Sequence, residues 1–181
     1  MSDLTPACDR MIEVVTGVAS EQLASPICCT GYTVGDLIDH VDLVAQGATA
    51  LARGSGELSN TNSAHLEPDW QATVIQHVQP LGKAWDDPAA WEGIGDVPGS
   101  DLSIATWGTI TLTELVVHGW DIATATGQSF DLPDHPLQGC LDHVAEFVPN
   151  APLSNLWGPP VEVQPDAALL DRILAITGRA P

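Results

Sequence analysis

The apolar run 112–127 carries side chains whose types and spacing fit a metal site. Glu114 and His118 stand four residues apart, so on a helix both project from one face, one turn apart. A carboxylate and an imidazole in this arrangement supply half of a metal site. Asp121 follows three residues later on nearly the same face. This run alone predicts an ion held inside a helical bundle, with at least one more ligand from elsewhere in the chain.

The further ligand is expected to be His40, which lies beside the apolar face of a helix that Thr33 is predicted to cap. Two histidines and a glutamate with an open fourth position are typical of catalytic zinc. They also suit nickel, iron or manganese, because imidazole and carboxylate discriminate poorly among these ions. The open position can take water or a substrate thiol as thiolate. Asp36 or Asp39 is expected to hydrogen-bond a ligating histidine, and Asp121 becomes a hydrogen-bonding or helix-packing residue.

A metal-free interpretation of the same residues stays open. A Glu-x-x-x-His pair at helical spacing also arises by chance, and a single histidine on an apolar face, such as His40, is usually a hydrogen-bonded core residue. Against this, Glu114 is followed by the apolar residues 115–117, and burying a carboxylate costs free energy unless it is paired. The other histidines are interpreted as surface or core residues: His65, His77, His135 and His143.

Apolar residues at helical spacing predict the elements that position these ligands. The predicted helices span residues 4–23, 33–51, 69–91, 102–126, 135–148 and 167–176. Pro80 is expected either to kink the third helix or to divide it into two, and Gly127 to end the fourth. Residues 53–66 are predicted to form a mobile polar loop, and residues 157–165 an extended tail with room for a short strand. The pattern predicts an all-α helix bundle in a single domain over residues 1–181.

Charge and hydropathy narrow the classes of partner. The chain has 24 acidic and five basic residues, a formal net charge of −19 and a pI near 4.1. Such a chain repels phosphate backbones and anionic membranes, so neither nucleic acid nor membrane is an expected partner. No apolar run approaches the roughly 18 to 20 residues of a membrane span, and the N-terminus lacks the basic start of a signal peptide. We therefore expect a cytoplasmic protein that binds a small molecule or a thiol, with a homodimer as a further option.

Motifs for other chemistries are missing from the sequence. There is no C-x-x-C spacing, no Gly-x-Ser-x-Gly elbow and no phosphate-cradling glycine motif. Cys28 and Cys29 are adjacent, and a disulfide between neighbours would be strained. Free, mostly buried thiols are expected at the four cysteines: Cys8, Cys28, Cys29 and Cys140.

Three blocks of the sequence resemble a known family. They are residues 29–40, residues 114–127 with the sequence His-Gly-Trp-Asp at 118–121, and residues 157–179 with their closing Gly-Arg. Together they are similar to the metal-binding proteins related to the N-terminal domain of mycothiol-dependent maleylpyruvate isomerase, in the DinB-like superfamily. The resemblance covers nearly the whole chain in order, whereas residues 53–100 match only in character.

The resemblance implies a DinB-like four-helix bundle, here with extra short helices and a short extended C-terminal segment. It also implies a divalent metal, usually zinc, on His40, Glu114 and His118, with a low-molecular-weight thiol as cosubstrate in the open position. The implied activity is that of a thiol-dependent S-transferase or isomerase. A non-catalytic metal or small-ligand binding protein is the alternative. Maleylpyruvate isomerisation itself is not expected, because the isomerase's additional C-terminal domain is not expected here and Thr124 replaces a common arginine.

Overall fold

The computed structural model describes residues 2–28, 31–55, 65, 67–95, 101–150 and 157–181. Within these residues the chain is helical and has no strand, which confirms the all-α fold class. The α-helices are α1 (Thr5–Gly17), α2 (Val34–Ala52), α3 (Trp70–Ala84), α4 (Ile104–Thr126), α5 (Asp134–Phe147) and α6 (Leu169–Ile176). Among the described residues, no helix is both long enough and apolar enough to cross a membrane.

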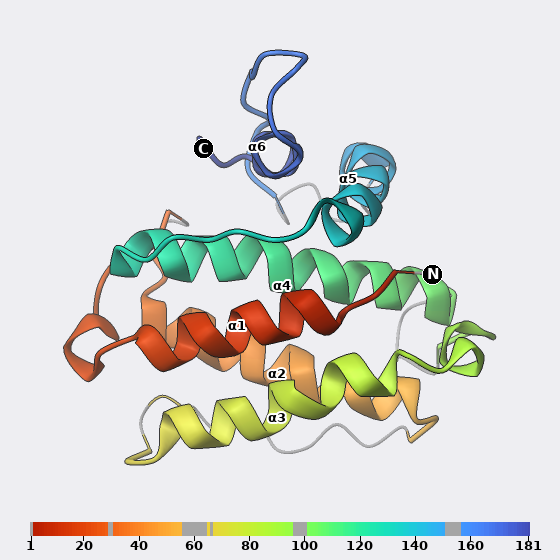
Figure 1. Ribbon diagram of the computed structural model, residues 1–181, viewed down its shortest axis with the longest axis horizontal. Coiled ribbons are helices and arrows are strands. Elements are labelled where there is room, and N and C mark those ends of the chain that lie inside the picture. The colour runs from red at the N-terminus through yellow and green to blue at the C-terminus, as the bar shows by residue number, and fades with distance from the viewer. Residues whose placement is uncertain (1, 29–30, 56–64, 66, 96–100, 151–156) are drawn as a thin grey trace.

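Helix α4 is the central element of the fold (Figure 1). Helices α1 and α2 each pack against both α3 and α4, which closes a four-helix bundle. Helix α5 packs on the other side of α4, and α6 packs on α5. Because α4 has neighbours on both sides, its buried residues are spread around its circumference rather than along one stripe. Most side chains of α4, polar ones included, therefore point toward a neighbouring helix.

The predicted caps of the two ligand-bearing helices are confirmed. The hydroxyl of Thr33 accepts a hydrogen bond from the backbone N–H of Asp36 at 3.2 Å. The carboxylate of Asp36 accepts one from the backbone N–H of Thr33 at 2.9 Å, which completes a capping box at the start of α2. Gly127 follows the last residue of α4 with a φ of 73°, the left-handed conformation that glycine adopts most easily.

The first helix is shorter than predicted. It ends at Gly17 rather than near residue 23, because Val18 is extended, with φ −78° and ψ 122°. The side-chain amide of Gln71 donates to the carbonyls of Val15, Thr16 and Val18 at 3.0 to 3.3 Å. The last carbonyls of a helix lack intrahelical donors, and here that of Val15 also accepts from the N–H of Val18 at 3.3 Å. A side chain from α3 thus contributes donors at the point where the helix stops.

The predicted third helix also differs from the structure. Helix α3 continues through Pro80 as one helix, so its interpretation as two helices in series is wrong. It ends at Ala84, and a separate 3-10 turn spans Pro88–Trp91. Asp87 is extended, with φ −75° and ψ 121°, as expected for a residue that precedes proline. The proline at 88, rather than the one at 80, separates the two segments.

The other predicted segments agree with the structure to within two residues at helix ends. The tail from residue 157 to the start of α6 contains no strand, and its Val161 N–H donates instead to the carbonyl of Ala175 at 2.9 Å. Of the predicted mobile loop 53–66, residues 56–64 and 66 lie outside the described residues.

Gly108→Ala is expected to lower the free energy of unfolding by about 1–3 kcal/mol through overpacking. A Cβ atom at Gly108 would lie 2.6 Å from ring atoms of both Trp85 and Trp91, and the ring of Trp85 is buried in the core. Urea unfolding measures the change. Gly139→Ala is the matched control within α5, because the one close approach of its Cβ would be to the movable hydroxyl of Ser2, at 2.6 Å. Equal effects of the two substitutions would contradict the overpacking argument.

Candidate metal centre

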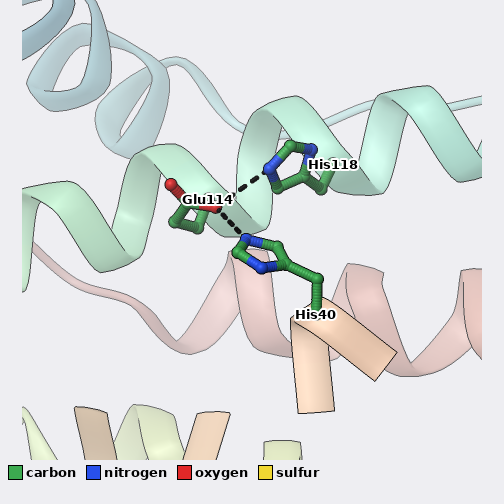
Figure 2. Close-up of side chains that lie close together, drawn as sticks. All are labelled: His40, Glu114 and His118. Carbon is green, nitrogen blue, oxygen red and sulfur yellow. Dashed lines mark hydrogen bonds and ion pairs between the residues drawn. The ribbon is translucent and has the colours of Figure 1, made fainter. Parts of the chain in front are cut away.

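The three predicted ligands lie together between α2 and α4 (Figure 2). His40 projects from α2, and Glu114 and His118 project from α4, one turn apart. The Nε2 atom of His40 lies 2.8 Å from Oε2 of Glu114, and Nε2 of His118 lies 2.9 Å from the same oxygen. One potential ligand atom from each residue lies within 4.8 Å of the others. The structure thus brings together all three residues that the sequence singled out.

The donor set of this triad fits a divalent cation. The Nε2 atoms of His40 and His118 both face Oε2 of Glu114, and an ionised carboxylate accepts from whichever of these nitrogens carries a proton. Imidazole nitrogen and carboxylate oxygen are the ligand types of zinc, nickel, iron and manganese sites. A divalent ion would supply positive charge between the three side chains.

The triad also shifts the pKa values of its members. Burial of Glu114 opposes ionisation, but hydrogen bonds from His118 and His40 outweigh it and lower the pKa of the carboxyl to about 2. Burial of His118 disfavours its charged form, but hydrogen bonds to Asp121 and Glu114 raise the pKa of the ring to about 9. At neutral pH the metal-free site therefore contains a negatively charged Glu114 next to a positively charged His118.

The metal-free protein is expected to be most stable between roughly pH 4.5 and 6.5 as far as these groups are concerned. Glu114 has a lowered pKa, so its stabilisation is present above its unfolded pKa of 4.5 and lost as the pH falls through about 2. His118 has a raised pKa, so its stabilisation is present below 6.5 and lost as the pH rises through about 9. Urea unfolding with a chelator present should show that the free energy of unfolding falls by roughly 1–3 kcal/mol both below and above this pH range.

The control for this pH dependence is the double variant Glu114→Gln, His118→Gln, which removes both shifted groups. Its unfolding free energy should change less with pH than that of the natural chain. If the natural chain were as stable at about pH 9.5 as at about pH 5.5, the contribution of His118 would be contradicted.

Asp121 hydrogen-bonds the outer ring nitrogen of His118. Its Oδ2 accepts from Nδ1 of His118 at 3.1 Å, and its side chain is completely buried. This contact agrees with the hydrogen-bonding role expected of Asp121, whereas the expectation that Asp36 or Asp39 binds a ligating histidine is wrong. Asp36 is engaged in the capping box of α2, where backbone N–H groups need acceptors. Asp39 is adjacent in sequence to His40, so it points to a different side of α2.

Two histidines outside the triad are paired with aspartates on α2. Nδ1 of His65 lies 2.8 Å from Oδ2 of Asp39, whose Oδ1 accepts from the backbone N–H of His65 at 2.9 Å. Nδ1 of His77, on α3, lies 2.6 Å from Oδ1 of Asp42. Both contacts join segments far apart in sequence, so neighbouring residues gave no indication of them. The interpretation of His65 and His77 as residues outside the ligand set agrees with the described geometry.

Sequence reasoning missed the other side chains that bind Asp121. Arg179 binds both carboxylate oxygens, and the thiol of Cys28 donates to Oδ1 at 3.0 Å. A buried Asp121 needs a cationic partner, and the closing Gly-Arg was one of the blocks that carried the resemblance, but neither signal paired the two residues. Among the cysteines, Cys8 and Cys140 are buried as expected, Cys28 is exposed, and Cys29 lies outside the described residues.

Comparison with known proteins yields a family and two relatives. The profile of the mycothiol maleylpyruvate isomerase N-terminal domain family matches residues 4–123, which include all three residues of the triad. Two uncharacterized proteins of Mycobacterium tuberculosis, Rv0738 of strain H37Rv and MT0763 of strain CDC 1551, are each 28% identical over 136 residues. These residues cover 70% of this chain and 66% of each relative, just under two thirds of the relative's length. No solved structure matches the chain significantly.

Proposed function

This chain belongs to the mycothiol maleylpyruvate isomerase N-terminal domain family, and from that premise we propose that it is a metal-dependent enzyme. His40, Glu114 and His118 hold a divalent ion, with zinc favoured over nickel, iron and manganese for a site of two histidines and one carboxylate. The observation that carries the proposal is the convergence of two imidazole Nε2 atoms on one oxygen of Glu114, from two separate helices.

The proposed reaction class is thiol-dependent S-transfer or isomerisation, with a low-molecular-weight thiol of the mycothiol type as cosubstrate. The family description, which names a mycothiol enzyme, supports this class. A bound divalent ion would lower the pKa of a thiol or water in its open position. The protein's own residues orient the site: Glu114 supplies a buried negative charge, and Asp121 fixes the ring of His118.

Unequal exposure of the ligands supports an accessible site. The side chain of His40 is 45% exposed, whereas those of Glu114 and His118 are 15% and 12% exposed. Solvent therefore reaches the triad on the α2 side, while the α4 side is covered by protein. A structural metal site is usually closed by four protein ligands, whereas a catalytic one keeps a position for water or substrate. The proposed thiol approaches from the side of His40.

Cobalt substitution tests both parts of this proposal. The chain is expected to bind about one equivalent of Co²⁺ and to show visible d–d absorption. Addition of a small thiol should then produce a sulfur-to-cobalt charge-transfer band in the near ultraviolet, because the thiolate occupies the open position. His77→Ala is a matched control, since its ring lies outside the triad and should not affect either spectrum.

The alternative function gives a different result in the same experiment. A non-catalytic metal site would bind Co²⁺ without responding to thiol, and chelation would sharply lower the melting temperature. A metal-free scaffold would bind no ion under any loading condition. Either result would overturn the proposal of a thiol-dependent enzyme, and the second would also overturn the proposed metal site.

A further inference from the structure

We infer that Arg179 is a positioning residue of the metal centre, which acts through Asp121 on the ring of His118. This inference rests on the proposed function, because it concerns the ligand geometry of that centre. Arg179 lies outside residues 4–123, which the family profile matches, and is far from His40 in the sequence. The centre would thus depend on three distant parts of the sequence.

The contact between Arg179 and Asp121 is a buried, two-point ion pair. Nη2 of Arg179 donates to Oδ2 of Asp121 at 2.8 Å, and Nε donates to Oδ1 at 3.2 Å. The side chains are 5% and 0% exposed. Nη1 also donates to the carbonyl of Thr177 at 2.7 Å, and the guanidinium carbon lies 5.6 Å from the centre of the Trp157 ring. Paired donors of a planar guanidinium fix the plane of the carboxylate as well as its position.

That fixed carboxylate determines how His118 presents its nitrogens. Oδ2 of Asp121 accepts from Arg179 and from Nδ1 of His118, so Nδ1 has to carry a proton. A neutral imidazole has one N–H group, and placing it at Nδ1 leaves the lone pair at Nε2. Nε2 is the atom of His118 that faces Glu114 and His40. Arg179 therefore favours the tautomer and ring orientation of His118 that can bind an ion.

The backbone after α6 is shaped to place Arg179 at this point. The N–H of Gly178 donates to the carbonyl of Ala175 at 3.2 Å, and that of Arg179 donates to Leu174 at 2.8 Å. This pair of bonds is a Schellman motif, which requires a left-handed residue, and Gly178 has a φ of 82°. A Cβ atom at Gly178 would lie 2.6 Å from Cα of Gly158. Both backbone conformation and packing therefore require glycine immediately before Arg179.

The test compares Co²⁺ binding by the full chain with that of Arg179→Lys and Arg179→Gln. Lysine keeps the positive charge but lacks the fork that holds both oxygens, and glutamine removes the charge. Co²⁺ affinity should fall by about 10- to 100-fold in each folded variant, the range for loss of a ligand's outer partner. The d–d spectrum should shift as His118 turns. Arg172→Lys, on α6, is the control and should leave both readouts unchanged.

A folded Arg179→Lys or Arg179→Gln protein with unchanged Co²⁺ affinity and spectrum would overturn the inference and leave the proposed function intact. Failure of the unsubstituted chain to bind Co²⁺ would overturn both. A measurement on the unsubstituted, zinc-loaded chain covers the case in which neither variant folds. Nitrogen-edited NMR of His118 should show a slowly exchanging proton on Nδ1, and an unprotonated Nδ1 would overturn the inference.

Discussion

His118→Ala is expected to abolish stoichiometric metal binding. His118 supplies one of only three protein ligands in the triad, and its Nε2 lies 2.9 Å from the carboxylate oxygen on which the site converges. Loss of an outer partner already reduces metal affinity by about 10- to 100-fold, so loss of a ligand should reduce it by more than about 100-fold. Metal analysis after dialysis should give about one equivalent for the natural chain and none for the variant.

The matched control for this prediction is His77→Ala. His77 is also a partly buried histidine paired with an aspartate, Asp42, but it lies on α3 outside the triad. Its removal should leave the metal content unchanged. A His118→Ala protein that keeps one equivalent with the natural affinity would show that the ion is bound elsewhere.

Asp121→Ala is expected to lower the free energy of unfolding of the metal-free protein by about 3–5 kcal/mol, because it removes one partner of a buried ion pair. Arg179 would remain in the interior, 5% exposed, after losing the carboxylate that receives two of its hydrogen bonds. Urea unfolding in the presence of a chelator measures the change. Asp142→Ala is the control, since Asp142 lies exposed on α5 and, among the described residues, accepts only from Gln138. It should change stability by less than about 0.5 kcal/mol.

A double variant separates the contribution of charge to stability from that of packing at Asp121. In the double variant Asp121→Leu, Arg179→Met both charges are replaced by apolar groups, and the stability should recover by several kcal/mol relative to Asp121→Ala. If the double variant were no more stable than Asp121→Ala, lost packing rather than the loss of the guanidinium's carboxylate partner would explain the effect. The metal affinity of the double variant should nevertheless remain low, because no acceptor is left for Nδ1 of His118.

The sequence was sufficient to predict the residues of the candidate site because most of that information is local. Glu114 and His118 are related by one helical turn, so recognising the helix was enough to place them on the same face. The cap of α2 and the end of α4 follow from short motifs around Thr33 and Gly127. The all-α fold class follows from the period of the apolar residues. His40 required more, because only the packing of α2 on α4 brings it to the other two.

The features that the sequence did not reveal are contacts between distant segments. The side chain that ends α1 belongs to Gln71, and the partner of Asp39 is His65. Asp121 and Arg179 are separated by 58 positions in the chain. Helical periodicity describes which face of an element is buried, but not which polar group of another element meets it. The wrong assignment of Asp36 and Asp39 arose because both are near His40 in sequence, whereas hydrogen bonding is decided in space.

The pairing of Asp121 with Arg179 also links ion binding to the docking of the last helix. The bundle of α1 to α4 contains all three triad residues, whereas the guanidinium that fixes Asp121 arrives only when α6 docks through α5. If Arg179 positions the ligands through Asp121, high-affinity ion binding should require that α6 has docked. The appearance of strong Co²⁺ binding during refolding would then report that this docking is complete.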